Sequence, residues 1–266
     1  MASTGELAML LPPSEGKARG GEGSWDPASG VFAELGPDRS RVADELASVL
    51  MAGDYDPGRL FGVKGPTLAH AIEADMHLRG SPVLPAHDRY TGVVYDHLDW
   101  HGLSPRGRER GGDAIVVFSG LLGVSGICDP VPDYRLKMSV SLGGLGNVAR
   151  WWRDRLSPVL NARLDGRFVI DGLPGEHSRA WAPRPETYAA WVQLRFERDR
   201  GGRRRVVGHD AKAAKGSLMR QLLESRESPE KALLDVDAEG YLFDWTSSVL
   251  EPEPGQPATY VYVRPE

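Results

Sequence analysis

The chain has 266 residues, of which 41% are hydrophobic, and its 32 basic and 37 acidic side chains give a formal net charge of −5. This composition excludes a disordered tail, a mini-protein and a uniformly basic nucleic-acid coat protein. No Ser/Gly/Pro-rich linker divides the sequence, so we expect one domain over residues 1–266.

The cysteine content and the apolar stretches indicate the compartment. The only cysteine, Cys128, cannot form an internal disulfide, so nothing calls for an oxidising environment. The longest strongly apolar stretch, residues 114–124, is shorter than the ~20 residues that span a bilayer. The first residues lack the basic and apolar regions of a secretion signal. We therefore expect a cytoplasmic monomer that does not bind membranes.

The first half of the chain predicts alternating strands and helices. The apolar run Leu7 to Leu11 predicts a buried strand that Pro12 and Pro13 end. Apolar residues at helical spacing predict helices over 38–51 and 66–78. The polar stretch 104–113 reads as a loop that leads into a buried strand over 114–118.

The second half continues this mixed pattern. The clearest amphipathic helix covers residues 147–164, and we expect Pro158 to kink or split it. A strand over 167–173 is followed by a β-hairpin from Trp191 to His209 that turns at residues 201–202. A helix over 210–225 and a short edge strand over 241–244 complete the pattern. The fold class is therefore α+β or mixed α/β in a single domain.

Charge is unevenly distributed along the chain. Residues 1–133 have a net charge of −8, residues 134–226 of +10, and residues 227–266 of −7. The basic middle block could form a positive surface or cleft, or its arginines could pair with acids of the flanking segments. Only six cations are lysines, which makes each one worth locating: Lys17, Lys64, Lys137, Lys212, Lys215 and Lys231.

The loop after the first strand, PPSEGKARGG, is a candidate anion site. Ser14, Glu15 and Lys17 stand among several glycines, and such a loop offers backbone N–H groups and a cation to an anion. It is not a Walker A loop, because Leu11 and Ala18 occupy positions that require glycine and Ser/Thr. A solvated turn is the alternative.

The segment LFGVKGPTLAHAI, residues 60–72, matches the hairpin of a helix-hairpin-helix element near residues 55–78. In such hairpins glycines let the backbone approach a phosphate, and N–H groups at the start of the second helix bind it. Gly62, Lys64, Gly65 and Thr67 are the candidate phosphate-binding residues. An ordinary helix-helix turn is the alternative.

Two further segments gather polar side chains. Tyr134, Arg135 and Lys137 place a hydroxyl and two cations within four residues, and an extended backbone would put both cations on one face. In AKAAKGSLMR, residues 211–220, helical spacing places cations on one side. The candidates there are Lys212, Lys215 and Arg220, and a solvated helix face is the alternative.

The histidines give a weaker signal. His97 and His101 are spaced i, i+4 and could chelate a metal ion on a helix, but HExxH is absent and no third ligand is identifiable. We expect no metal site and no cofactor.

Six segments in order resemble the YaaA family, which is associated with peroxide stress resistance, and in particular its actinobacterial type, in which PPSEGK opens the chain. They are LLPPSEGK at 10–17, YTGVVYDHL at 90–98, FSGLLGV at 118–124, DPVPDYRLKM at 129–138, AKAAKGSLMR at 211–220 and DAEGYLFD at 237–244. Lys17, Ser119, Tyr134, Arg135 and Lys212 fall on family motif positions. One departure is SGIC at 125–128, where better-known members carry Leu-Arg-Pro.

The resemblance implies a fold and a function. The fold would be a single mixed α/β domain of the type called the cantaloupe fold. The function would be cytoplasmic DNA binding, through a helix-hairpin-helix and a positively charged cleft, that limits damage by hydrogen peroxide. We expect the DNA binding to be weak, independent of sequence and steeply dependent on salt. Ser14, Ser119, Arg135, Lys215 and Arg220 would contact the anion together with the hairpin.

An enzyme acting on a nucleotide-like or phosphorylated small molecule is the alternative. A desolvated Lys17, Lys137 or Lys212 could act as a base or Schiff-base nucleophile, as in a glycosylase/lyase. Glu15 or Glu239 would be its acid/base partner, and Tyr134 would complete the pocket. Convergence of Lys17, Lys137, Lys212 and Arg135 in one deep pocket would favour an enzyme, whereas dispersal along an open groove would favour a DNA track.

Overall fold

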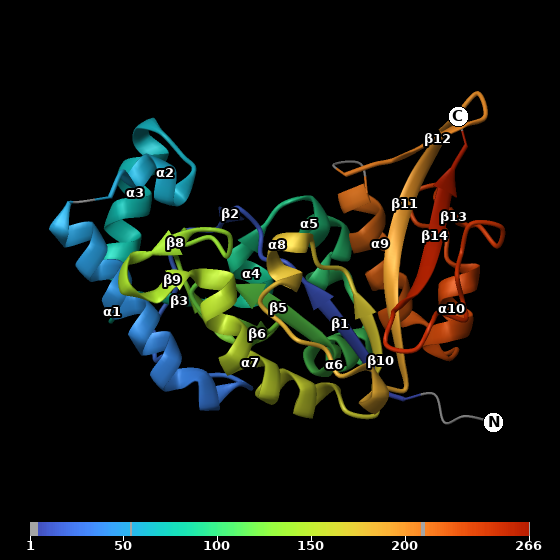
Figure 1. Ribbon diagram of the computed structural model, residues 1–266, viewed down its shortest axis with the longest axis horizontal. Coiled ribbons are helices and arrows are strands. Elements are labelled where there is room, and N and C mark those ends of the chain that lie inside the picture. The colour runs from blue at the N-terminus through green and yellow to red at the C-terminus, as the bar shows by residue number, and fades with distance from the viewer. Residues whose placement is uncertain (1–4, 54, 209–210, 266) are drawn as a thin grey trace.

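The computed structural model describes residues 5–53, 55–208 and 211–265. Its largest sheet contains β1 (Leu7–Leu11), β5 (Ile115–Ser119), β6 (Gly123–Gly126), β10 (Phe168–Asp171), β11 (Ala190–Arg200), β12 (Arg203–Val206), β13 (Leu242–Phe243) and β14 (Ala258–Arg264). The order is β13-β14-β11-β10-β1-β5-β6, with β12 paired to β11 (Figure 1). Three two-stranded sheets pair β2 (Gly16–Lys17) with β4 (Tyr90–Thr91), β3 (Val83–Pro85) with β7 (Pro130–Pro132), and β8 (Ser141–Leu142) with β9 (Gly146–Asn147).

Helices surround this sheet. The α-helices are α1 (Gly36–Ala52), α2 (Pro57–Phe61), α3 (Gly65–Met76), α4 (Ala86–Arg89), α5 (Val93–Leu98), α6 (Pro105–Ala114), α7 (Val148–Leu164), α8 (Gly175–Ser178), α9 (Ala211–Glu224) and α10 (Pro229–Asp235). Short 3-10 turns are η1 (Ala33–Leu35), η2 (Trp100–Gly102), η3 (Gly143–Leu145) and η4 (Pro185–Thr187). Among the described residues, no helix is both long and apolar enough to cross a bilayer.

The order of the parallel strands locates a crevice. β1 pairs in parallel with both β5 and β10, and β11 continues the parallel arrangement beyond β10. The chain therefore runs from β1 to β5 on one side and later returns to β10 on the other side. Where the strand order reverses in this way, the loops at the carboxyl ends of the two strands diverge and leave a crevice. The loops that follow β1 and β10 border this crevice.

Burial explains why these segments form the centre of the sheet. Every residue of β1, β5 and β10 is buried, as expected for parallel strands covered on both faces. The expected mixed α/β class is confirmed. The expected hairpin is β11 and β12, whose turn uses Gly201 and Gly202 at φ of 57° and 79°. His209, where we placed the end of that hairpin, and Asp210, where we placed the start of the next helix, lie outside the described residues.

The loop expected over 104–113 is wrong, because this segment forms α6. The Ser104 hydroxyl caps the helix by accepting a hydrogen bond from Gly107 N at 3.0 Å. Glu224 holds the cap in turn, since its carboxylate accepts from the Ser104 backbone N–H at 2.6 Å and from the Ser104 hydroxyl at 2.6 Å. Arg110 donates to the Leu223 carbonyl at 2.8 Å. Contacts with α9 therefore stabilise a helix that composition alone disfavours.

Pro158 does not split α7, which runs unbroken through it. The helix buries Trp152, Leu156 and Leu160 in the core, and the Trp152 indole donates to the Gly120 carbonyl at 2.9 Å. Tertiary packing of this face outweighs the loss of one backbone hydrogen bond at the proline.

The segment near 55–78 contains two helices joined by a tight turn at residues 62–64. The Asp56 side chain caps α2, and Gly62 ends it at φ 68°. The helices α2 and α3 project from one end of the molecule beside α1 (Figure 1). That this turn is a DNA-binding helix-hairpin-helix stays a prediction.

Candidate functional site

A cavity of about 80 Å³ lies at the crevice beyond β1 and β10. The loop after β1, the loop after β10, residues 134–138 and the α2–α3 turn all contribute to its wall. The lining residues are Pro13, Ser14, Glu15, Lys17, Phe61, Val63, Tyr134, Arg135, Leu136, Lys137, Met138, Glu176 and His177. We call this cavity the lysine pocket.

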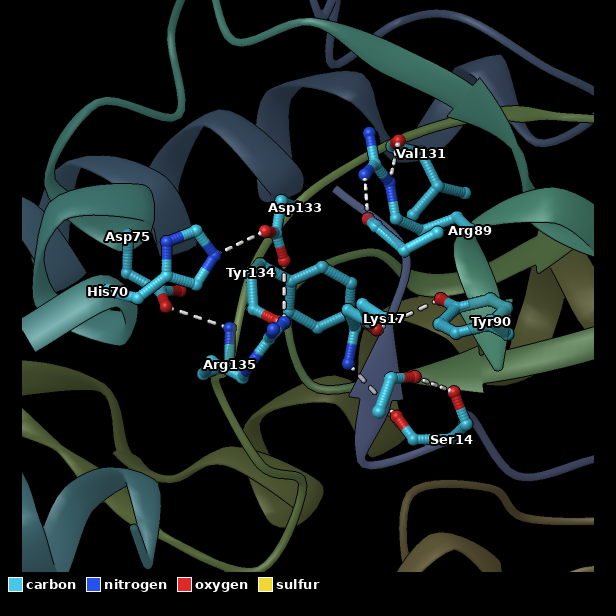
Figure 2. Close-up of polar contacts among 12 residues, drawn as sticks. Ser14, Lys17, His70, Asp75, Arg89, Tyr90, Val131, Asp133, Tyr134 and Arg135 are labelled. Carbon is cyan, nitrogen blue, oxygen red and sulfur yellow. Dashed lines mark hydrogen bonds and ion pairs between the residues drawn. The ribbon is translucent and has the colours of Figure 1, made fainter. Parts of the chain in front are cut away.

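Lys17 is the central cation of the lysine pocket. Its Nζ donates to the Ser14 carbonyl at 3.0 Å and lies over the ring of Tyr134, 4.3 Å from the ring centroid (Figure 2). The ring of Tyr90 lies on another side, at 5.5 Å. Burial, assisted by the positive charge of Arg135, lowers the pKa of Lys17 to about 7. A larger share of Lys17 than of an exposed lysine is therefore a neutral, nucleophilic amine at pH 7.

Arg89 fixes the loop that carries Lys17. Its buried guanidinium donates to the carbonyls of Ala18, of Gly20 at 2.9 Å and of Val131 at 3.0 Å. The strands β2 and β4 also pair Lys17 with Tyr90. The backbone beside Lys17 is thus held by polar contacts on two sides, which pre-organises the ammonium group.

Tyr134 presents its ring rather than its hydroxyl to the lysine pocket. The hydroxyl accepts a hydrogen bond from Ser119 at 2.7 Å and shares another with the Tyr90 hydroxyl at 2.9 Å. Burial raises the pKa of Tyr134 well above its ordinary value. Ser119 is itself fully buried and accepts hydrogen bonds from the N–H groups of Leu121 and Leu122. These hydroxyls hold the turn after β5 and are not free to bind a ligand.

An acidic cluster orients Arg135. Asp133 binds the guanidinium at 2.5 Å through one oxygen and His70 Nε2 at 2.7 Å through the other (Figure 2). Asp75, on α3, accepts from the Arg135 backbone N–H at 2.7 Å. Asp75 is fully buried and its second oxygen has no hydrogen-bond partner within the described residues. Burial raises its pKa to about 7.

Lys137 joins the lysine pocket to the α2–α3 turn. Its Nζ lies 3.6 Å from Glu15 Oε1. It also lies 2.7 Å from the place that a Cβ on Gly62 would occupy, so the glycine admits the ammonium group against the turn. Lys64, Gly65 and Thr67 are exposed on the far part of this turn and do not line the pocket.

His177 also lines the lysine pocket, from the loop after β10. It is buried, and its Nδ1 has no hydrogen-bond partner in the described part of the chain. Burial lowers the pKa of His177 to about 4, so the ring is neutral at pH 7. Sequence reasoning missed both His177 and Asp75. The available signals were the position of His177 after a buried strand and an acid at position 75 on the face that buries Ala71.

The remaining predicted residues lie elsewhere. Lys212 and Lys215 border a separate cavity with Leu11 and Pro174, and Lys215 Nζ donates to the Gly172 carbonyl at 3.2 Å. Arg220 binds Asp99 at 2.8 Å. Glu239 is a turn residue at φ 58°. Lys17, Arg135 and Lys137 therefore converge in the lysine pocket, as an enzyme would require, whereas Lys212 lies at another cavity.

Part of the basic middle block is paired with acids from outside the block. Several arginines of residues 134–226 form ion pairs with acids of the flanking segments, which is the alternative to a positive surface. The pairs are Arg155 with Asp38 at 3.1 Å, Arg163 with Asp113 at 2.7 Å, Arg167 with Asp113 at 2.7 Å, Arg204 with Asp244, and Arg220 with Asp99 at 2.8 Å. Arg135 and Lys137 differ from these because both line the lysine pocket.

Comparison with known proteins identifies the family of the chain. The family model described as "Peroxide stress protein YaaA" matches residues 7–246. The chain belongs to the YaaA peroxide stress family. A UPF0246 protein of Streptomyces coelicolor is 34% identical over 225 residues, which cover 84% of this chain and 85% of that protein. A UPF0246 protein of Corynebacterium efficiens is 33% identical over 227 residues, covering 82% and 86%.

The structure separates the YaaA motif positions into two groups. Lys17, Tyr134 and Arg135 line the lysine pocket. Gly216 instead lets α9 approach α5, because a Cβ there would collide with the Val94 carbonyl, and Arg220 binds the turn after α5. The AKAAKGSLMR motif therefore serves in part to pack two helices together.

Proposed function

We propose that this YaaA family member acts in the peroxide stress response by binding DNA at the α2–α3 turn, with the lysine pocket receiving an anionic group of the bound strand. The observation that carries the proposal is that Lys137 Nζ lies 2.7 Å from where a Cβ on Gly62 would be, which brings a pocket cation against the exposed turn. Backbone N–H groups at the start of α3 and the cations Lys64 and Lys137 would each meet a phosphate oxygen.

Charge balance supports a weak and sequence-independent interaction. The overall charge is −5, and several arginines are already paired with acids, which lowers the affinity of the chain for a polyanion. Because each phosphate contact releases counterions from the DNA, the binding should still fall steeply as salt rises. The groups of the site are cations and backbone N–H donors, which contact phosphates and read no base sequence.

Fluorescence anisotropy with labelled single-stranded, duplex and nicked DNA tests this proposal. We expect binding at low salt that falls as salt rises, and a loss of binding in the Gly62→Ala/Gly65→Ala double variant. Absence of binding to all three DNAs at low salt, or unchanged binding by a folded double variant, would contradict it.

Catalysis by Lys17 is a second candidate function, favoured by the pocket convergence of three cations and by the lowered pKa of Lys17. In this mechanism the neutral Nζ adds to the carbonyl carbon of an aldehyde, such as the opened deoxyribose of an abasic nucleotide. The hydroxyl of the resulting carbinolamine takes up one proton, from the acid partner or from solvent, and leaves as water, which gives a protonated imine on Lys17. Arg135 and Lys137 would bind the adjacent phosphate. Glu15, which lines the pocket and lies 3.6 Å from Lys137, is the acid/base candidate.

Borohydride trapping with an abasic oligonucleotide tests this second function. Borohydride reduces an imine to a stable amine, so we expect a covalent complex with the wild-type chain and none with Lys17→Arg. The Lys231→Arg variant is the matched control, since Lys231 is exposed and paired with Glu227. A panel of nucleotides scored by thermal shift extends the search to other substrates. No trapped complex and no shift in the panel would exclude catalysis of this kind, without affecting DNA binding.

A further inference from the structure

A second polar cluster lies outside the lysine pocket. His87 and Asp88 belong to α4, and His101 belongs to η2. Asp88 Oδ1 lies 2.7 Å from His101 Nε2 and 3.1 Å from His87 Nδ1. One donor atom from each residue falls within 4.8 Å of the other two. We propose that His87, Asp88 and His101 form a binding site for one divalent transition-metal ion.

The donor spacing fits metal coordination. Imidazole nitrogen and carboxylate oxygen bind Zn²⁺ at roughly 2.0–2.2 Å, so the ligand atoms of a tetrahedral site stand roughly 3.3–3.6 Å apart. The Asp88 oxygen lies 2.7 Å from one ring nitrogen, as a hydrogen bond, and 3.1 Å from the other, so small side-chain shifts would arrange the three donor atoms around an ion. Two imidazoles and one carboxylate are ligands that suit Zn²⁺, Fe²⁺, Co²⁺ or Ni²⁺ and leave other coordination positions open.

His87 gives independent support for a ligand. Its Nδ1 is buried and makes no hydrogen bond within the described residues, although a carboxylate oxygen is near, because the two groups are not aligned for one. A buried ring nitrogen without a partner is costly, and a metal ion bound in the ring plane would satisfy it.

The surrounding fold holds the ligands in place. The His87 ring stacks on Trp100 at a centroid distance of 4.8 Å and meets the His101 ring edge-on at 5.5 Å. Asp99, at φ 43°, ends α5 and caps η2 by accepting from Gly102 N at 3.2 Å. The three ligands also border a cavity of about 240 Å³, which gives solvent and exogenous ligands access.

The turn at Asp99 that ends α5 explains why the spacing of His97 and His101 did not reveal this site. The helix ends at Leu98, so His97 and His101 do not share a helical face. His97 Nδ1 instead pairs with the Val93 carbonyl at 2.9 Å. The ligands that complete the set with His101 come from α4, 13 and 14 positions earlier in the chain.

Isothermal titration of the EDTA-treated full-length chain with Zn²⁺, and with Ni²⁺ as a second probe, tests the site. We expect one ion per chain, and an affinity that falls at least about tenfold in His101→Ala and in Asp88→Asn. His101 is 74% exposed, so its replacement leaves the core intact. The His97→Ala variant is the matched control and should bind as the wild type does.

Tryptophan fluorescence supplies a second readout. Ni²⁺ quenches nearby indoles, so binding at His87 should quench Trp100 in the wild type and not in His101→Ala. Absence of binding to the wild type, or equal affinity of the wild type and a folded His101→Ala variant, would overturn the proposal. An equal loss of metal affinity in His97→Ala would also overturn the proposal, because the ion would then be bound by His97 and His101.

Discussion

Lys137 and Gly62 are complementary: the lysine Nζ lies 2.7 Å from where the Cβ of any larger residue at position 62 would be. The two residues are far apart in sequence, yet they bring the α2–α3 turn to the mouth of the lysine pocket. The turn alone is a common helix connection and the pocket alone is a small cavity. In the proposed function, the backbone N–H groups of the turn and the cations of the pocket bind one ligand together.

Gly62→Ala should weaken DNA binding by about fivefold or more, because the new Cβ displaces Lys137 from the turn. Gly53→Ala is the matched control: Gly53 has a φ of 70°, close to the 68° of Gly62, but nothing lies within 4 Å of its Cβ position. Both changes should cost about 1 kcal/mol of folding free energy, because alanine is strained at positive φ. Anisotropy and thermal unfolding measure the two effects. Equal loss of DNA binding in both variants would assign the effect to stability alone.

Lys137→Ala should lower the salt dependence of DNA binding. Removing one phosphate contact reduces the slope of log K against log salt by about one. Lys137→Arg should restore the slope, and Lys212→Ala should leave it unchanged, because Lys212 borders a different cavity. Anisotropy titrations at a series of salt concentrations give these slopes. An unchanged slope in Lys137→Ala would place the phosphate contacts elsewhere.

Lys17 should react with acetic anhydride at pH 7 at least about tenfold faster than Lys231. Only the neutral amine reacts, and burial lowers the pKa of Lys17 to about 7, whereas the ion pair with Glu227 raises the pKa of Lys231. Mass spectrometry of short labelling reactions measures both rates in one sample. Faster labelling of Lys231 would show that Lys17 is protonated or inaccessible.

Asp75→Asn should stabilise the protein above pH 7, by on the order of 2 kcal/mol. The folded-state pKa of Asp75 is raised to about 7 from 3.8, so the folded protein binds more protons than the unfolded chain between these values. The free energy of unfolding of the wild-type protein therefore decreases as pH rises from about 4 to about 7. The advantage of the variant should be near zero at pH 4 and reach its full size above pH 7.

Urea unfolding of both proteins at several pH values measures this difference. His177, whose pKa falls to about 4, contributes the opposite slope in part of the same range, so the variant must be compared with the wild type at each pH. Asp44→Asn is the control, because Asp44 is exposed in its pair with Arg79. A constant difference across the pH range would mean that Asp75 is not protonated at neutral pH.

Several elements could be predicted from the local sequence because, in each, a single local property determines the structure. The apolar run Leu7 to Leu11 is buried on both faces, and the Gly201–Gly202 turn needs positive φ. The helix α6 starts with a local signal, Ser104 at the N-cap followed by Pro105. Its glycines disfavour a helix, however, and the contacts that outweigh them come from Glu224, more than a hundred residues away.

The site was predicted only in part for a related reason. Lys17, Arg135 and Lys137 stand in polar segments next to strands, where a sequence pattern can find them. Asp75 and His177 enter the site through the packing of α3 and through the reversal of strand order beside β1, which are properties of the folded chain.

Lysine footprinting tests the central claim, that the α2–α3 turn and the lysine pocket form one anion-binding site. The chain has only six lysines, so acetylation with and without saturating DNA, followed by mass spectrometry, covers all of them. We predict that DNA protects Lys64 and Lys137, and slows the labelling of Lys17, while Lys212, Lys215 and Lys231 react unchanged. Protection confined to Lys212 and Lys215, or no protection of Lys137 at saturating DNA, would contradict the account.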